Sequence, residues 1–111
     1  MKAKNIKLVN WKLLYRADYS NPRAIKKLLL SMDSLRCLAQ KGDTVALSIY
    51  LDLKDALYAE GVLSKKQRKY LLLWMAGYEQ NQIGWMCGAG QDVISRGISR
   101  GAKNISKYLQ E

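Results

Sequence analysis

The side chains with the most distinctive chemistry lie in one segment near the C-terminus. Gln91, Asp92, Ser95, Arg96 and Ser99 fall in the first turns of an expected helix. In the major groove of DNA, glutamine pairs with the edge of adenine, arginine with the edge of guanine, and serine with either. These five residues are therefore our candidates for contacts with base edges.

Basic side chains occur on either side of this segment in the sequence. Lysine and arginine neutralise phosphates and hold a protein in register on a duplex without reading its bases. The plainer interpretation is a solvated helix face, or cations that serve only solubility. Cations at the start of a helix oppose its dipole, however, and this favours an anionic partner. The candidate phosphate contacts are Lys65, Lys66, Arg68, Lys69, Arg100, Lys103 and Lys107.

The overall charge agrees with a polyanionic partner. The 111 residues include 19 basic and 9 acidic side chains, which gives a net charge of +10. The density of net positive charge is higher after residue 63, where few carboxylates interrupt it. This balance suits a nucleic acid first and an acidic membrane surface second, and a generally basic soluble protein is the plainer alternative.

The composition argues against an enzyme and against a metal or cofactor site. The chain has no histidine and no glycine-rich phosphate loop, and Asp52 and Asp55 have the spacing of an exposed helix face. Cys37 and Cys87 fit no zinc spacing, and their apolar neighbours predict buried free thiols in a reducing compartment. No apolar run suggests a signal peptide or approaches the roughly 20 residues that span a bilayer. We therefore expect no membrane contact and a cytoplasmic location, in a bacterium or a phage-infected host.

The segment after Pro22 is predicted to form one long helix. Asn21 is a good cap, and proline is tolerated at the first helical position. Apolar residues then recur at three- and four-residue spacings, which predicts an amphipathic helix as far as Gln40. Ahead of it, residues 6–16 fit either a short helix or an arm. Their aromatic members, which the sequence assigns to no role, are Trp11 and Tyr15.

A second N-terminal helix is expected to follow, capped by Asp43 or Thr44. Residues 45–53 alternate between apolar and polar side chains in a way that is compatible with a strand. Helix is favoured because the run continues to Glu60 and no turn residue occurs before Gly61.

The C-terminal part opens with a capping box. Ser64 and Gln67 have the spacing at which each side chain bonds the other residue's amide, and this predicts a helix that ends at Gly77. Its aromatic and apolar side chains, Trp74 and Met75 among them, are expected in the core.

A short helix, a tight turn and a longer helix are predicted to follow. Residues 79–86 form the short helix, with Ile83 and Met86 facing inward, and Gly88 permits the left-handed backbone of the turn. In residues 91–109, isoleucine, alanine and leucine recur at spacings of three and four, which gives one apolar stripe. The order of elements is that of a helix-turn-helix unit in an all-α chain.

These segments resemble region 4 of bacterial sigma factors, and in particular the region 4-like proteins of phages and prophages that regulate transcription. That family opens with Leu-Ser/Thr-x-x-Gln-Arg, continues with an Ile-Ala/Gly pair, and closes with an apolar–Ser–Arg–small run in the recognition helix. The chain departs from the family at Glu79, Cys87, Ala89 and Gly90, which weakens the caps and the turn. The matching stretches are Leu63 to Arg68, Gly77 to Gly84, and Val93 to Gly101.

The resemblance implies a domain organisation and a function. Residues 62–111 would be a helix-turn-helix DNA-binding domain, and residues 1–61 a helical N-terminal region for extension, oligomerisation or partner contact. The five candidate residues from Gln91 to Ser99 would inherit the base-facing role, and double-stranded DNA and RNA polymerase would be the partners. The first 60 residues are too short for a promoter-melting domain, so a regulator is expected and not a complete sigma factor.

Two other functions remain open at this stage. One is an adaptor that binds RNA polymerase or another regulator, which the acidic Asp92 mildly favours. The other is a DNA-packaging subunit of a phage, similar to a small terminase, in which a helix-turn-helix unit adjoins an oligomerising region; homo-oligomerisation is left open. Trp85 is expected to cover the N-terminal helices, with a role as a partner-binding anchor as the alternative.

Overall fold

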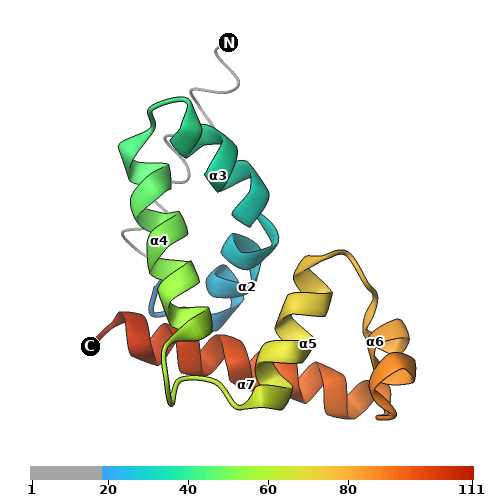
Figure 1. Cartoon of the computed structure of the whole chain (residues 1–111). Helices are drawn as coiled ribbons and strands as arrows, with labels where there is room; N and C mark the ends of the chain where they lie inside the picture. The colour runs from blue at the N-terminus through green and yellow to red at the C-terminus, as the bar shows by residue number, and fades with distance from the viewer. Residues whose placement is uncertain (1–18) are drawn as a thin grey trace.

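The computed structural model describes residues 19–111, and within this range every regular element is an α-helix (Figure 1). The predicted all-α class is therefore confirmed for the described part. The predicted short helix or arm at residues 6–16 lies outside it. The helices are α2 (Pro22–Leu30), α3 (Met32–Gln40), α4 (Thr44–Tyr58), α5 (Lys65–Met75), α6 (Gln80–Cys87) and α7 (Gln91–Leu109).

Three helices begin at the side-chain caps that the sequence predicts. Asn21 Oδ1 accepts a hydrogen bond from the amide of Arg23 at 2.9 Å. Asp43 Oδ1 accepts from two amides in the first turn of α4, at 3.0 and 3.1 Å. Ser64 and Gln67 exchange two bonds of 3.1 Å, which completes the predicted capping box of α5. Each cap satisfies amides that have no partner inside the helix.

The prediction of a single helix over residues 22–40 is wrong, because the helix is interrupted at Ser31 and forms two helices, α2 and α3. Ser31 Oγ donates to the carbonyl of Lys27 at 2.9 Å, and the Ser31 amide bonds Leu28 O at 3.0 Å, one residue short of the α-helical partner. A serine hydroxyl that bonds the carbonyl four residues earlier competes with the helical ladder and bends the helix. The apolar spacing that supported one helix does not reveal this competition.

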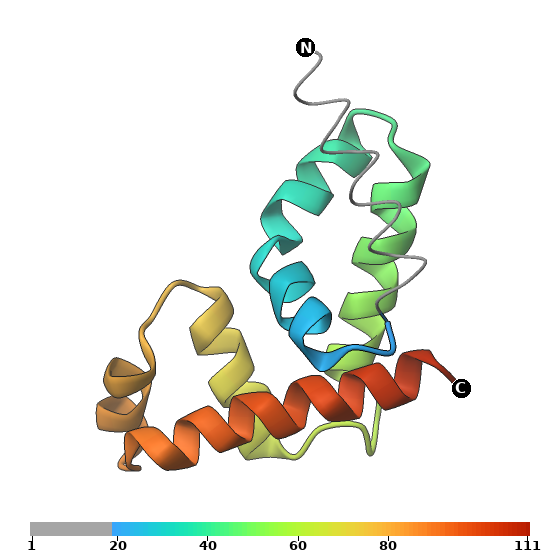
Figure 2. The same ribbon diagram turned by 180° about the vertical axis from the view of Figure 1, so that it is seen from behind.

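The helices are arranged around α7 (Figures 1 and 2). The helices α3 and α4 lie side by side, run in opposite directions and project away from α7. Helix α7 runs across the base of the molecule, with α5 and α6 packed on its first half and α2 and the end of α4 on its second half. The two halves of the chain thus share one helix.

One hydrophobic core connects the N-terminal and C-terminal helices. The boundary predicted between residues 61 and 62 falls in the loop that joins α4 to α5. Polar contacts tie the end of α7 to the N-terminal region: Ser106 Oγ donates to Tyr19 O, and the Tyr108 hydroxyl donates to Asp55 Oδ2 at 2.6 Å. The hydrogen bond to Asp55 raises the pKa of Tyr108 above its ordinary value. The fully buried side chains of α7 are Ile94, Ile98, Ala102 and Ile105.

A tight turn connects α6 to α7. Gly88 adopts a left-handed backbone with φ of +67°, as its position in the sequence predicts. The amide of Ala89 then donates to Gly84 O at 2.8 Å. A Cβ atom on Gly84 would lie 2.5 Å from the carbonyl oxygen of Ala89, so the turn folds back so closely that only glycine fits without a shift. Gly90 starts α7 without a side-chain cap.

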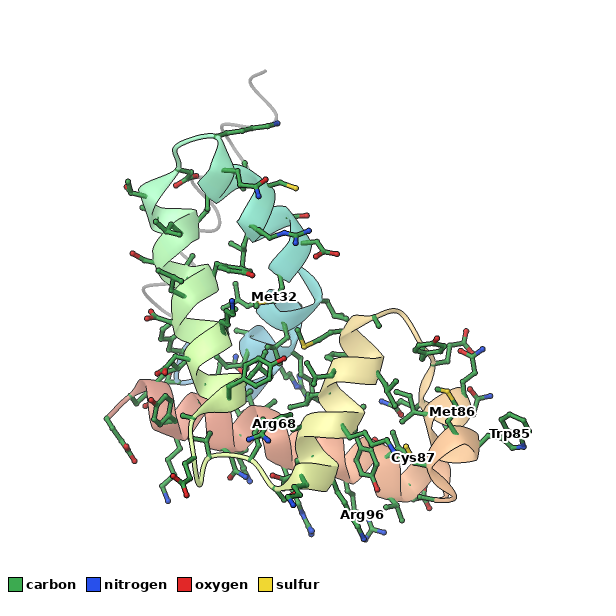
Figure 3. All side chains as sticks on the ribbon, viewed as in Figure 1. Met32, Arg68, Trp85, Met86, Cys87 and Arg96 are labelled. Carbon is green, nitrogen blue, oxygen red and sulfur yellow. The ribbon has the colours of Figure 1, made fainter. Side chains whose placement is uncertain are left out.

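The inward face of α6 differs from the prediction. Ile83 and Gly84 are buried and Cys87 is half-buried, whereas Met86 is 43% exposed. Cys87, four residues after Ile83, continues the face that packs on α5 and α7, so the expectation of an inward Met86 is wrong. Trp85 is 88% exposed and points away from every other helix, so it does not cover the N-terminal helices (Figure 3).

Two further predictions concern cysteines and the core of α5. Trp74 and Met75 are half-buried and pack against the core, in agreement with the prediction. The expectation of buried thiols is wrong for Cys37, which is exposed because Leu35 and not Cys37 lies on the inward face of α3. Both cysteines are free.

The close approach at Gly84 predicts that a side chain at this position destabilises the fold, whereas one at Gly90 does not. We expect Gly84→Val to lower the free energy of unfolding by about 1–3 kcal/mol, because the added carbons meet the Ala89 backbone. The matched control is Gly90→Ser, which adds atoms where nothing lies within 4 Å and offers a better cap. Urea unfolding should show the control unchanged or raised by a few tenths of a kcal/mol. An unchanged midpoint for Gly84→Val would contradict the packing described here.

Candidate nucleic-acid interface

A row of cations runs along the exposed face of α7. Arg96, Arg100, Lys103 and Lys107 are spaced four, three and four residues apart, which places them on one side of a helix. All four are exposed, and they lie opposite the apolar stripe that α7 buries. We call these four residues the basic stripe. In Figure 3, Arg96 points away from the helices that pack on α7.

The five residues predicted to face bases divide into two groups. Gln91, Asp92 and Arg96 are exposed at the start of α7, whereas Ser95 and Ser99 are half-buried. Arg96 Nε bonds the carbonyl of Asp92 at 3.3 Å within the same helix, so this side chain lies along the helix surface. Ser99 accepts a hydrogen bond of 2.9 Å from Lys26 Nζ on α2. The first three are thus open to a ligand, and the two serines lie on the flank of α7.

Helix α5 packs across α7, projects away from it and carries cations of its own (Figures 1 and 2). Lys65, Lys66 and Lys69 are exposed in its first turns. Asn104 Nδ2 of α7 donates to Gln67 Oε1 at 3.3 Å, which links the start of α5 to α7 beside the basic stripe. Three of the four cations predicted on this helix are therefore solvent-accessible.

The fourth cation, Arg68, is occupied by contacts inside the protein. Its Nε donates to the carbonyl of Leu57 at 2.8 Å, and its guanidinium lies 5.8 Å from the centre of the Tyr58 ring. Carbonyls in the last turn of a helix lack partners within it, and a cation there also complements the helix dipole. Arg68 therefore caps the C-terminus of α4, a structural role that its sequence neighbours do not reveal.

Two glycines let α5 approach α7 closely. A Cβ on Gly97 would lie 2.7 Å from the ring of Tyr70, and one on Gly101 would lie 2.8 Å from Leu71 Cδ1. Both partners are buried. The four-residue spacing of the glycines places them on one side of α7, so α5 packs on that side and leaves the basic stripe free.

Two cations that the sequence interpretation missed lie on the other flank. Arg23 and Lys26 belong to α2, and Lys26 reaches Ser99 across the α2–α7 contact. Their three-residue spacing places them on one face of α2, and that spacing is the only sequence signal. Their approach to α7 is a consequence of tertiary packing.

The electrostatic environment of these cations is almost free of acidic partners. Among pairs of described residues, one ion pair is formed, between Arg36 and Asp33 at 3.6 Å on α3. No cation of the basic stripe or of α5 pairs with a carboxylate of residues 19–111. Their positive potential is therefore available to an anion at this surface.

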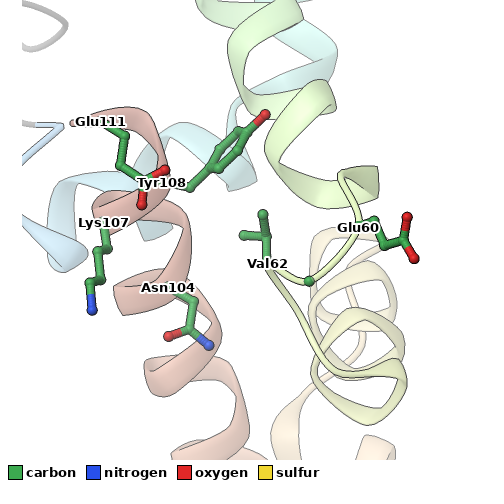
Figure 4. Close-up of a pocket in the computed structure, with 7 residues that line it drawn as sticks. Glu60, Val62, Asn104, Lys107, Tyr108 and Glu111 are labelled. Atoms are coloured by element: carbon green, nitrogen blue, oxygen red, sulfur yellow. The ribbon is translucent and has the colours of Figure 1, made fainter.

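A hollow near the end of α7 carries both signs of charge. It has a volume of about 420 Å³, and its lining includes Glu60, Lys107 and Glu111 (Figure 4). With two carboxylates and one cation, the interior of this hollow does not suit a polyanion, although Lys107 forms an ion pair with neither carboxylate. No group of three potential metal ligands occurs among residues 19–111, and none of the described helices is both long and apolar enough to cross a membrane.

Comparisons with known protein families, with curated protein sequences and with solved structures find no match to this chain.

The contacts of Arg68 predict that its side chain contributes more to the stability of the fold than that of Lys69, its neighbour in sequence. We expect Arg68→Ala to lower the free energy of unfolding by about 1–2 kcal/mol, because it leaves the Leu57 carbonyl without its charged donor. Lys69→Ala, the matched control on the exposed face, should change stability by less than about 0.5 kcal/mol. Urea titrations monitored by circular dichroism measure both. Equal stability of the two variants would argue against the capping role.

Proposed function

We propose that this chain is a sequence-specific, double-stranded DNA-binding transcription regulator of the phage or prophage type. In this proposal α6, the turn at Gly88 and α7 act as a helix-turn-helix unit, as the resemblance to sigma region 4 implies. The observation that carries the proposal is the basic stripe: four exposed cations on the face of α7 opposite its buried stripe, without a carboxylate partner in the described chain.

The dimensions of α7 are compatible with insertion into the major groove. Its 19 residues correspond to a length of about 28 Å at 1.5 Å per residue. The major groove is about 12 Å wide and admits an α-helix. The exposed residues of the first turns, Gln91, Asp92 and Arg96, would then meet base edges. Ser95 and Ser99 would lie nearer the wall of the groove.

The phosphate contacts would come from the rest of the basic stripe and from α5. Arg100, Lys103 and Lys107 continue along α7 beyond the base-facing turns, and α5, which packs against α7, would add its three exposed lysines. Such contacts position a protein on a duplex but carry no sequence information. Arg68 contributes less directly, because its Nε holds the end of α4.

The two kinds of contact predict different mutant behaviour. Selection of bound duplexes from a random library first supplies a preferred site. On that site, Arg96→Ala should weaken binding by about 1–3 kcal/mol and blur the sequence preference, because a base contact is lost. Lys66→Ala should weaken preferred and random duplexes alike and reduce the slope of log K against log salt by about 0.9. Fluorescence anisotropy at several salt concentrations measures both effects. If both variants bound preferred and random duplex as the parent does, this mode of binding would be refuted.

A second function, binding to RNA polymerase, is favoured by the outer face of α6. Trp85 is 88% exposed, and Tyr78 and Met86, each 43% exposed, lie beside it around a shallow hollow of about 320 Å³. Large exposed aromatic side chains are frequent anchors of protein interfaces. The resemblance to sigma region 4 names polymerase as the partner to test.

The aromatic patch on α6 yields a separable prediction. Trp85→Ala should weaken binding to purified bacterial RNA polymerase by at least about tenfold, since anchors of this type contribute about 2 kcal/mol or more. Duplex binding should stay within about twofold of the parent. Leu51→Ala, which removes another exposed apolar side chain on α4, is the control. If the parent does not bind polymerase, or if both variants bind it equally, the second function fails and the first is unaffected.

A further inference from the structure

A pocket of about 350 Å³ lies where the start of α2 meets the middle of α7. Four of its seven lining residues are cations: Arg23 and Lys26 from α2, and Arg100 and Lys103 from α7. None of the seven is acidic. The hollow near the end of α7 (Figure 4) has two carboxylates in its lining, so the concentration of cations distinguishes this pocket from that hollow.

The polar groups of the pocket are suited to a phosphate oxygen. Lys26 Nζ and Ser99 Oγ lie 2.9 Å apart, with the lysine as donor. Because a hydroxyl has one donor and two acceptor positions, Ser99 can accept from Lys26 and still donate its own hydrogen to an anion. The nine-residue α2 begins at this pocket, and the positive end of its dipole adds to the four charges.

Four cations that have no acidic ion-pair partner among residues 19–111 repel one another in the free protein. Residues 19–111 place no carboxylate against them within ion-pair distance, so their mutual repulsion is left to solvent and salt. An anion bound among them would relieve that repulsion and gain charge-assisted hydrogen bonds. If these cations served only to keep the surface hydrated, they would not need to converge on one hollow from two helices.

The position of the pocket indicates which anion it receives. Glycines of α7 face α5 on one flank of the basic stripe, while Ser99 and Ser106 face α2 and the segment before it on the other. The two backbones of a duplex border the major groove on its two sides. Lysines of α5 would meet one backbone, and a matching site for the other is needed on the α2 side.

We propose that the α2–α7 pocket binds a backbone phosphate of duplex DNA on the flank of α7 opposite α5. The inference rests on the proposed function and extends it: residues of the N-terminal region, Arg23 and Lys26, become part of the DNA interface. Helix α2 then has two roles, since its apolar side packs on α7 and its first turn clamps the duplex.

The test compares two positions on α2. Arg23 lines the pocket, and its side chain forms no hydrogen bond or ion pair with residues 19–111, whereas Lys27 is exposed on the same helix and does not line the pocket. We expect Arg23→Glu to weaken duplex binding on the order of tenfold at about 0.1 M salt, and Arg23→Ala combined with Lys26→Ala to reduce the slope of log K against log salt by about 0.9. Lys27→Glu should have a markedly smaller effect. Circular dichroism melts confirm that each variant is folded.

Each outcome of these measurements is decisive. If the parent binds duplex and Arg23→Glu binds no more weakly than Lys27→Glu, with an unchanged salt slope for the double variant, the pocket has no phosphate role and the proposed function still stands. If the parent binds no duplex, the proposed function fails and takes this inference with it. A further arm titrates inorganic phosphate and follows the amides of Arg23 and Lys26 by NMR. Saturation at low millimolar phosphate, without any effect of the Arg23 variants on duplex binding, would assign the pocket to a free phosphate and overturn the proposal.

Discussion

The burial of one apolar stripe on α7 determines the arrangement of the other helices. Ile94, Ile98, Ala102 and Ile105 are fully buried along more than half the length of the helix, and four other helices pack against α7 to cover them. The helices α5 and α6 cover the first half, and α2 and α4 cover the second. Because these partners occupy the apolar side and both flanks, a narrow strip stays in solvent. The cations of α7 lie on that strip, where their charges need not be desolvated.

The glycines of α7 are explained by the same packing. Glycine inside a helix costs about 1 kcal/mol relative to alanine, so Gly97 and Gly101 weaken α7 as an isolated helix. They also let Tyr70 and Leu71 of α5 lie against its backbone, where both side chains are buried. Burial of one large apolar side chain contributes about 1.5–3 kcal/mol, which is enough to offset the lower helix propensity. The glycines therefore lower the intrinsic stability of α7 but allow a close contact between α7 and α5.

Local features of the fold could be predicted from the sequence, and features that depend on tertiary contacts could not. The caps at Asn21, Asp43 and Ser64 and the left-handed turn at Gly88 each depend on a few neighbouring residues, and all four are present in the structure. The break at Ser31 was missed because a serine hydroxyl can either face solvent or bond a carbonyl of its own helix. Periodicity does not distinguish these two cases.

The candidate site shows the same division. The exposed cations of α7 follow from helical spacing, and the structure places them on one face. Two hydrogen bonds of the site join residues that are distant in sequence. Arg68 bonds the carbonyl of Leu57, 11 positions away, and Lys26 bonds Ser99, 73 positions away. Contacts of that range depend on how helices pack. The charge pattern of a single segment carries no information about them.

The sharing of α7 between the two halves of the chain has a thermodynamic consequence. A helix that contributes to the core of both halves cannot detach from one without exposing apolar side chains of the other, so the described chain should open as one cooperative unit. A ligand held on the exposed strip of α7 would bind only the folded form, and mass action would then stabilise α3 and α4 although neither touches that ligand. Slower hydrogen exchange in the α3–α4 hairpin would therefore report occupancy of a surface on the far side of the molecule.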